Sequence, residues 1–187
     1  MKFAPWMCLL LFAAMATAQT AQPAGVSSEW DVRKLLEGLD LLAQHLKPII
    51  DQVKPEAWVA KGAPDAYVAQ WKSAQAELRY LLSSSTALSK DPERLTLALD
   101  TYLRMQAMES TLGSLVEGIR KYQNPALADL AQSVVAENSN NRDRLSQYLT
   151  DLAAQKEQEF KVADREAQRC RGLLLNQPAP QRKTSRP

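Results

Sequence analysis

Apolar residues recur at steps of three and four along four long segments of this chain, and this pattern constrains its fold more than any other feature. In residues 29–53 they fall at Val32, Leu35, Leu36 and Leu39, and the same steps continue to the end of the segment. Such spacing is typical of an amphipathic α-helix, whereas a half-buried strand alternates every second residue. No segment alternates in that way, so the sequence predicts an all-α protein.

Proline and glycine separate these segments from one another. The predicted helices are residues 29–53, 65–89, 92–122 and 125–173. Pro48 should kink the first helix or end it near Leu46, and the connector 54–64 should hold one short turn that carries Trp58. Because short connectors favour antiparallel neighbours, we predict an up-down four-helix bundle.

Three helix starts carry capping signals. Ser28 with Asp31 is close to a capping box before the first helix. Asp91-Pro92 predicts that the third helix begins at once, with aspartate as the cap and proline in the first helical position. Asn124-Pro125 predicts the same arrangement for the last helix.

The last helix is far longer than the others if it is continuous. Unbroken from residue 125 to 173, it would extend about 75 Å at ~1.5 Å per residue and would overhang the bundle. Its weak point is Asn138-Ser139-Asn140-Asn141, because these side chains compete locally for backbone hydrogen bonds. We expect a continuous overhanging helix, with a break near Asn138–Asn141 as the alternative.

The first eighteen residues have the layout of a secretory signal peptide. A basic start is followed by an apolar run broken only by Pro5, and Ala16-Thr17-Ala18 places small residues ahead of a cleavage expected before Gln19. The run is shorter than the ~20 residues that span a membrane, so no transmembrane anchor is predicted. We expect a secreted or periplasmic protein, divided into a signal peptide (1–18), a flexible lead-in (19–27), a helical bundle domain (28–175) and a disordered basic tail (176–187).

The charge distribution and the cysteine content restrict the classes of partner that this chain could bind. The chain has 23 Lys+Arg against 21 Asp+Glu, and its basic excess lies toward the C-terminus, where it suits phosphate groups or an anionic envelope surface. Nucleic acid is not predicted, because basic and aromatic residues do not interleave. Of the 2 cysteines only Cys170 outlasts signal cleavage, so it is either buried and inert or pairs with another chain.

Side chains that carry catalysis are scarce. His45 is the only histidine, and its angle from the apolar stripe places it at the flank of the first helix, facing water or the edge of a neighbour. Metal centres in bundles use Glu-x-x-His pairs, and the sequence has neither these nor a zinc or phosphate-loop motif. We therefore predict no catalytic residue, no metal site and no cofactor, and a protein that is not an enzyme.

Glu109 departs from the helical pattern, because it falls close to the centre of the third helix's apolar face. A buried carboxylate is costly unless it is paired or protonated. Candidate partners for it are Asn138, Asn141, Gln75, Arg142 and Arg144. One interpretation is a wet edge or a polar layer that fixes the helix register. The other is an interior ligand cavity lined by Glu109, Met105, Met108, Asn138, Asn141 and Gln75, although core packing explains the two methionines more simply.

For the three tryptophans beyond the signal segment, we favour structural roles over binding roles. Trp71 lies on the apolar stripe of the second helix and is expected in the core. Trp30 at a helix start and Trp58 in a connector are expected to cap one end of the bundle, although exposed aromatics also anchor partners.

The segment 155–171 alternates in charge and has only a thin apolar line. Its members are Lys156, Phe160, Ala163, Ala167, Cys170 and Leu174. This near-heptad spacing suits either a solvated overhang or a coiled-coil seam with another chain. The candidate interaction residues are Phe160, Cys170, Arg165, Arg169 and Arg171.

Two functions from different classes remain. The first is an exported, non-enzymatic bundle that acts in protein–protein or cell-envelope interaction, through a protein partner or self-association. The alternative is an exported bundle that binds a small or amphipathic ligand between its helices.

Overall fold

The structure is a computed structural model that describes residues 29–175, with side chains from Val32 onward. The predicted signal peptide, the lead-in 19–27, the capping residue Ser28 and the basic tail 176–187 lie outside the described residues. None of the helices in the described part combines the length and the apolarity that crossing a bilayer requires.

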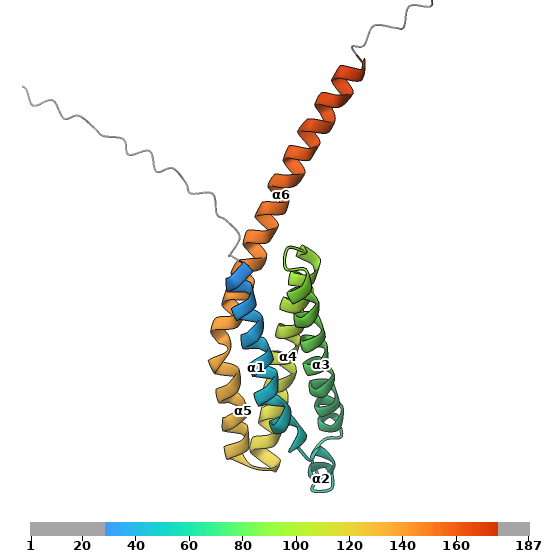
Figure 1. The fold of residues 1–187 in the computed structure, drawn as a ribbon. Coiled ribbons are helices and arrows are strands. Elements are labelled where there is room, and N and C mark those ends of the chain that lie inside the picture. Colours follow the sequence, from blue (N-terminus) through green and yellow to red (C-terminus); the bar gives the residue numbers. More distant parts are fainter. Residues whose placement is uncertain (1–28, 176–187) are drawn as a thin grey trace, which may run out of the picture.

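The described chain is built from helices alone. They are α1 (Glu29–Asp51), α2 (Pro55–Val59), α3 (Ala66–Lys90), α4 (Leu95–Tyr122), α5 (Pro125–Glu137) and α6 (Ser139–Leu175). Figure 1 shows α1 and α4 running one way, with α3 and the α5–α6 pair returning between them. Helix α1 packs on α3, α5 and α6, and α4 packs on the same three. The predicted all-α, up-down bundle is confirmed, with α5 and the first part of α6 together forming its fourth column.

The predicted apolar stripes form one core. Leu39 and Leu46 of α1, Leu81 of α3 and Leu112 of α4 are each within 1% of complete burial. Pro48 does not end α1, which continues to Asp51. Ile49 and Ile50 remain buried after the proline. We attribute the continuity of α1 to this packing, because burying such side chains contributes more than one lost backbone hydrogen bond costs.

One helix start differs from its prediction. Residues 91–94 form a turn, in which the Arg94 amide donates to the Asp91 carbonyl, and α4 begins only at Leu95. Asp91 therefore follows α3 and does not cap α4. The turn is held from outside, because the buried Tyr148 of α6 donates its hydroxyl to the Pro92 carbonyl.

The Asn124 cap is confirmed. Its side-chain oxygen accepts a hydrogen bond from the Ala126 amide at 2.9 Å, and Pro125 occupies the first turn of α5. The predicted short turn that carries Trp58 is also confirmed, as α2.

Burial of Tyr148 predicts a loss of stability in alkaline solution. Burial raises the pKa of the Tyr148 hydroxyl, and the charges of Glu93 and Asp91 raise it further. Because this pKa is higher in the folded protein than in the unfolded chain, its stabilising contribution is complete below about pH 10 and is lost as the pH rises through the folded pKa.

Urea unfolding measured between about pH 8 and 11 checks this expectation. The free energy of unfolding should fall less with pH for Tyr148→Phe than for the original protein. Tyr80→Phe is the control, since Tyr80 is 51% exposed, and it should keep the original pH dependence. An unchanged slope for Tyr148→Phe would contradict the assignment.

The expectation of one continuous last helix is wrong, and the alternative break occurs. Helix α5 ends at Glu137, and α6 begins at Ser139. The buried Asn138 donates a hydrogen bond from its side-chain nitrogen to the Val134 carbonyl at 3.0 Å. Its side-chain oxygen accepts a hydrogen bond from the side-chain nitrogen of Asn141 at 2.7 Å. These bonds compete with a regular helix, as expected for asparagine.

The junction lies against α1. A Cβ atom on Gly38 would be 2.5 Å from the Asn141 side-chain nitrogen. Glycine at this position therefore allows the asparagine pair to approach the α1 backbone.

The expected overhang is confirmed. Leu152 is the last buried residue of α6, and every residue from Glu157 to Arg171 is exposed. In Figure 1 this part of α6 projects beyond the ends of α1, α3 and α4. We call residues 157–175 the projecting segment; at ~1.5 Å per residue it is about 28 Å long.

Candidate functional site

The six residues proposed to line a ligand cavity do not come together. Met105 and Met108 are 0% and 1% exposed and belong to the core, as packing residues. Asn138 and Asn141 bond to each other at the α5–α6 junction. Gln75 lies in a groove between α1 and α3, and Glu109 lies in a different groove between α4 and α5. The sequence pattern predicts the angular position of each residue on its own helix, and this position does not indicate which helix lies opposite.

Glu109 sits at the edge of the bundle, with 19% of its side chain exposed. Arg142 of α6 donates to its carboxylate at 3.4 Å, so this arginine, and not an asparagine, is the partner that the structure places beside it. The charge of Glu109, followed by its hydrogen bond and by Asp143, raises the pKa of Arg142. The pair links α4 to α6, which agrees with the edge interpretation of Glu109.

The groove beside Glu109 is too small for most ligands. Its volume is about 150 Å³, whereas small-molecule sites usually span ~300–1,000 Å³. The groove between α1 and α3 is larger, at about 320 Å³. The residues that line this groove were not identified from the sequence, because only the packing of α1 on α3 brings them together. They are Lys47, Ile50, Asp51, Gln75, Leu78, Arg79 and Leu82.

Replacing Glu109 with leucine should change the free energy of unfolding by less than about 1 kcal/mol, since partly exposed ion pairs contribute little. Urea denaturation measures this change. Glu77→Leu is a matched control, because Glu77 also faces a partly exposed arginine of the neighbouring helix, Arg104, at 3.7 Å. A loss of several kcal/mol at Glu109 alone would show that its carboxylate is essential to the fold.

One end of the bundle is closed by an aromatic cluster, which we define as Trp58, Tyr67 and Tyr122. Trp58 is 1% exposed, stacks on Tyr122 with ring centres 6.2 Å apart, and meets the edge of Tyr67 at 5.6 Å. Gln123 accepts hydrogen bonds from the Trp58 ring nitrogen and the Lys54 amide, and donates to the Gln52 carbonyl. The predicted capping role of Trp58 is confirmed.

Trp30 does not share that end. Helix α1 begins at the end of the bundle from which α6 projects, and α2 lies at the opposite end (Figure 1). The expectation that both tryptophans cap one end is therefore wrong. Trp71 packs against the core as predicted and is partly buried, with its ring nitrogen donating to the Ile50 carbonyl at 2.9 Å.

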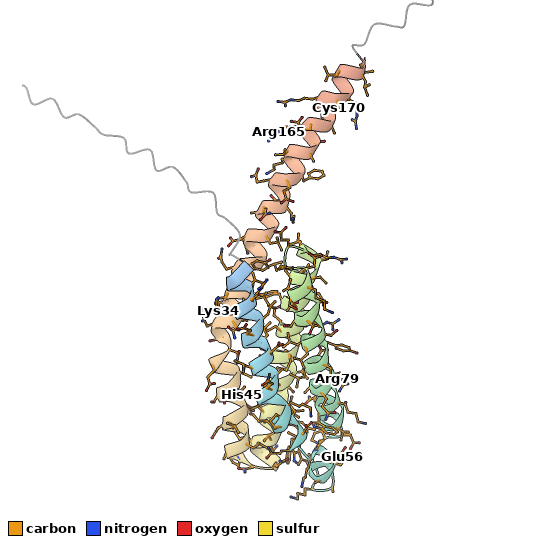
Figure 2. All side chains as sticks on the ribbon, viewed as in Figure 1. Lys34, His45, Glu56, Arg79, Arg165 and Cys170 are labelled. Carbon is orange, nitrogen blue, oxygen red and sulfur yellow. The ribbon has the colours of Figure 1, made fainter. Side chains whose placement is uncertain are left out.

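Polar groups that suit catalysis or metal binding are dispersed. His45 is exposed on α1, as its angular position predicted (Figure 2). Within residues 29–175, no group of three or more histidine, cysteine, aspartate or glutamate side chains is placed to hold a metal ion.

The projecting segment gathers all five candidate interaction residues on one element. Phe160 is 73% exposed, and Leu174 near the tip is 67% exposed. Cys170 is a free, exposed thiol, so its interpretation as a buried, inert residue is wrong. Figure 2 shows Cys170 and Arg165 on α6, well beyond the ribbon of the bundle.

The ion pairs of this segment are local. Glu157 lies 4.0 Å from Lys161, and Glu166 lies 2.9 Å from Arg169, each within one turn of α6. The Arg165 side chain donates to a carbonyl of its own helix at 3.2 Å. These contacts support the helix and leave its apolar side chains facing solvent.

Exposed large apolar side chains cluster on this segment more densely than on the rest of the described chain. They are Phe160, Val162, Leu173, Leu174 and Leu175. Exposed large apolar side chains gathered on one element are typical of an interaction site. Compared with protein-family models, with curated proteins and with solved structures, the chain has no match in any of the three.

Proposed function

We propose that this protein is an exported, non-enzymatic interaction protein that binds a protein partner through the projecting segment of α6. One observation carries the proposal: about 28 Å of helix stands clear of the bundle, with Phe160 and Leu174 mostly exposed. A helix that contributes no packing to its own core needs another reason to retain apolar side chains along one line.

Export rests on the first eighteen residues. Their basic start, apolar run and small residues before Gln19 are the pattern of a signal peptide. The basic residues toward the C-terminus favour an anionic envelope surface near the partner.

Site-specific photocrosslinking in an exporting host tests the proposal. A benzoylphenylalanine at position 160 should give crosslinked adducts of the full chain. The same probe at Tyr80, which is 51% exposed on α3, is the control and should give few. If position 160 yields no adduct above the control, the projecting segment does not bind a protein and the proposal fails.

A second candidate function is the binding of an anionic amphiphile in the groove between α1 and α3. Ile50, Leu78 and Leu82 give this groove an apolar lining, and its volume of about 320 Å³ falls within the range of ligand sites. Lys47 and Arg79 add positive charge at its edge, of which Lys47 is paired with Asp51. A fluorescent long-chain fatty acid should bind the original protein and bind Arg79→Glu more weakly. Equal binding by both would exclude this groove.

A further inference from the structure

The projecting segment keeps a regular heptad seam. Phe160, Ala167 and Leu174 occupy the first position of successive heptads, and Ala163 and Cys170 occupy the fourth. In coiled coils these two positions form the apolar contact between helices. With Lys156 included, the six seam positions extend over residues 156–174, which is just under three heptads.

Charge is distributed unevenly along this seam. Residues 157–166 contain four acidic and two basic side chains, a net charge of −2. Residues 167–175 contain two basic side chains and no acidic one, a net charge of +2. A second copy laid antiparallel places the acidic block on the basic block at both ends of the contact, whereas a parallel copy places each block on its own equivalent.

We propose that the partner of the projecting segment is a second copy of this chain, bound as an antiparallel two-helix coiled coil. This inference rests on the proposed function, since it names the partner of the same segment. In the register with the longest overlap, Phe160 faces Cys170 of the second copy, and Ala163 faces Ala167. The contact is isologous, so it closes as a dimer.

The flanking positions agree with this order. Glu157 and Arg171 both follow the fourth heptad position, and the antiparallel register brings Glu157 beside Arg171 of the second copy twice. Arg171 is exposed, and no ion pair within the described residues engages it. Asp164 meets its own equivalent once at the twofold axis, and so does Glu166. Each of these is a single exposed repulsion, and each costs little.

The parallel order fits less well. It would place Lys156 against its own equivalent inside the seam, where a charged side chain lowers stability. In the antiparallel order, Lys156 lies opposite Leu174. The tip of one α6 then reaches the base of the other projecting segment, so the two bundles lie at opposite ends of the contact, about 28 Å of helix apart.

Sedimentation velocity of the full chain over a range of concentrations tests the dimer. The original protein should show a reversible monomer–dimer equilibrium, and Phe160→Glu should abolish it. Val162→Glu is the matched control, because Val162 is 50% exposed on the same helix but lies outside the seam, and it should still dimerise. Circular dichroism should show the same helix content in all three, since both positions are exposed.

A charge swap tests the strand order. Glu157→Arg and Arg171→Glu should each weaken the dimer about tenfold, because each changes two equivalent pairs. The double variant should restore most of the affinity. Restoration occurs only in the antiparallel order, because the parallel order pairs Arg171 with Glu166 instead. Cys170 of the two copies would lie about 15 Å apart along the antiparallel seam, so no disulfide-linked dimer should form under oxidising conditions.

The outcomes separate this inference from the proposed function. A chain that stays monomeric at every concentration overturns the second copy as partner, and a dimer unaffected by Phe160→Glu overturns the seam. A dimer that the double swap does not restore, or that Cys170 crosslinks, overturns the antiparallel order. The proposed function fails separately, and only if the probe at position 160 gives no adduct above the Tyr80 control. Adducts of a mass other than twice the chain would keep the proposed function and overturn the second copy.

Discussion

Replacing Trp58 with alanine should lower the free energy of unfolding by about 3–5 kcal/mol, the range for removing a buried tryptophan. The side chain is 1% exposed and packs against Tyr67 and Tyr122. Its ring nitrogen donates to Gln123 at 3.1 Å. The substitution removes the centre of the aromatic cluster. It also removes one of the hydrogen bonds that hold Gln123, and Gln123 connects the end of α4 to the chain after α1.

Urea denaturation of two further variants tells these contributions apart. Trp58→Phe keeps a ring and loses the hydrogen bond, so it should cost clearly less than Trp58→Ala. Trp71→Ala removes the same type of side chain from a partly buried position, and it should also cost less. A loss below about 1 kcal/mol for Trp58→Ala would mean that the cluster does not close this end of the bundle, since a buried tryptophan should cost several times as much.

Replacing Gly118 with alanine should lower the free energy of unfolding by about 1–3 kcal/mol, which is the usual cost of overpacking. An added Cβ would lie 2.6 Å from the Tyr67 ring and 2.9 Å from the Trp58 ring. Both rings are held by the aromatic cluster, so neither can move away cheaply. The clash outweighs the gain of about 1 kcal/mol that alanine brings in a helix interior.

Gly113 provides a matched control on the same helix. It is exposed, and an added Cβ there would meet no atom within 4 Å. Gly113→Ala should therefore raise the free energy of unfolding by about 0.5–1 kcal/mol through helix propensity alone. The two identical substitutions on α4 should thus have opposite signs in thermal or urea unfolding. A stabilising Gly118→Ala would contradict the described packing of the cluster.

The two ends of the bundle differ in what their side chains contribute. The end with α2 is closed by aromatic packing and by the hydrogen bonds of Gln123. The other end is where α6 leaves the core after Leu152. Substitutions at the first end should change stability, whereas substitutions in the projecting segment should change association and leave stability within about 0.5 kcal/mol.

Several features could be predicted because they depend on residues close in sequence. Helical period identified α1, α3 and α4, and it placed α5 and α6 in one segment that forms the fourth column of the bundle. Asn124-Pro125 marked the start of α5, where the cap bonds to an amide two residues away. The overhang followed from the thin apolar line beyond residue 155, which cannot supply a core face.

Features that depend on a neighbour in space could not be predicted in this way. Asp91-Pro92 has the composition of a helix start, yet the hydroxyl of Tyr148, far along the chain, holds it as a turn. Glu109 was predicted close to the centre of the apolar face of its helix, but it lies at the edge of the bundle beside Arg142. Arg142 was only one of several candidate partners, because a single helix does not specify what lies opposite.

An all-α bundle with a helix too long for its core could be predicted from the amino-acid sequence, because helical period and the supply of apolar residues are local properties of the chain. The sequence marked Asn138–Asn141 as the weak point of this helix, but the packing of the helices determines that it breaks there and where it leaves the bundle. The break at Asn138 depends on its bond to Asn141 and on Gly38 of α1, which lets that pair approach. The exit after Leu152 is set by where the neighbouring helices end, since burial requires a partner surface that no local pattern contains.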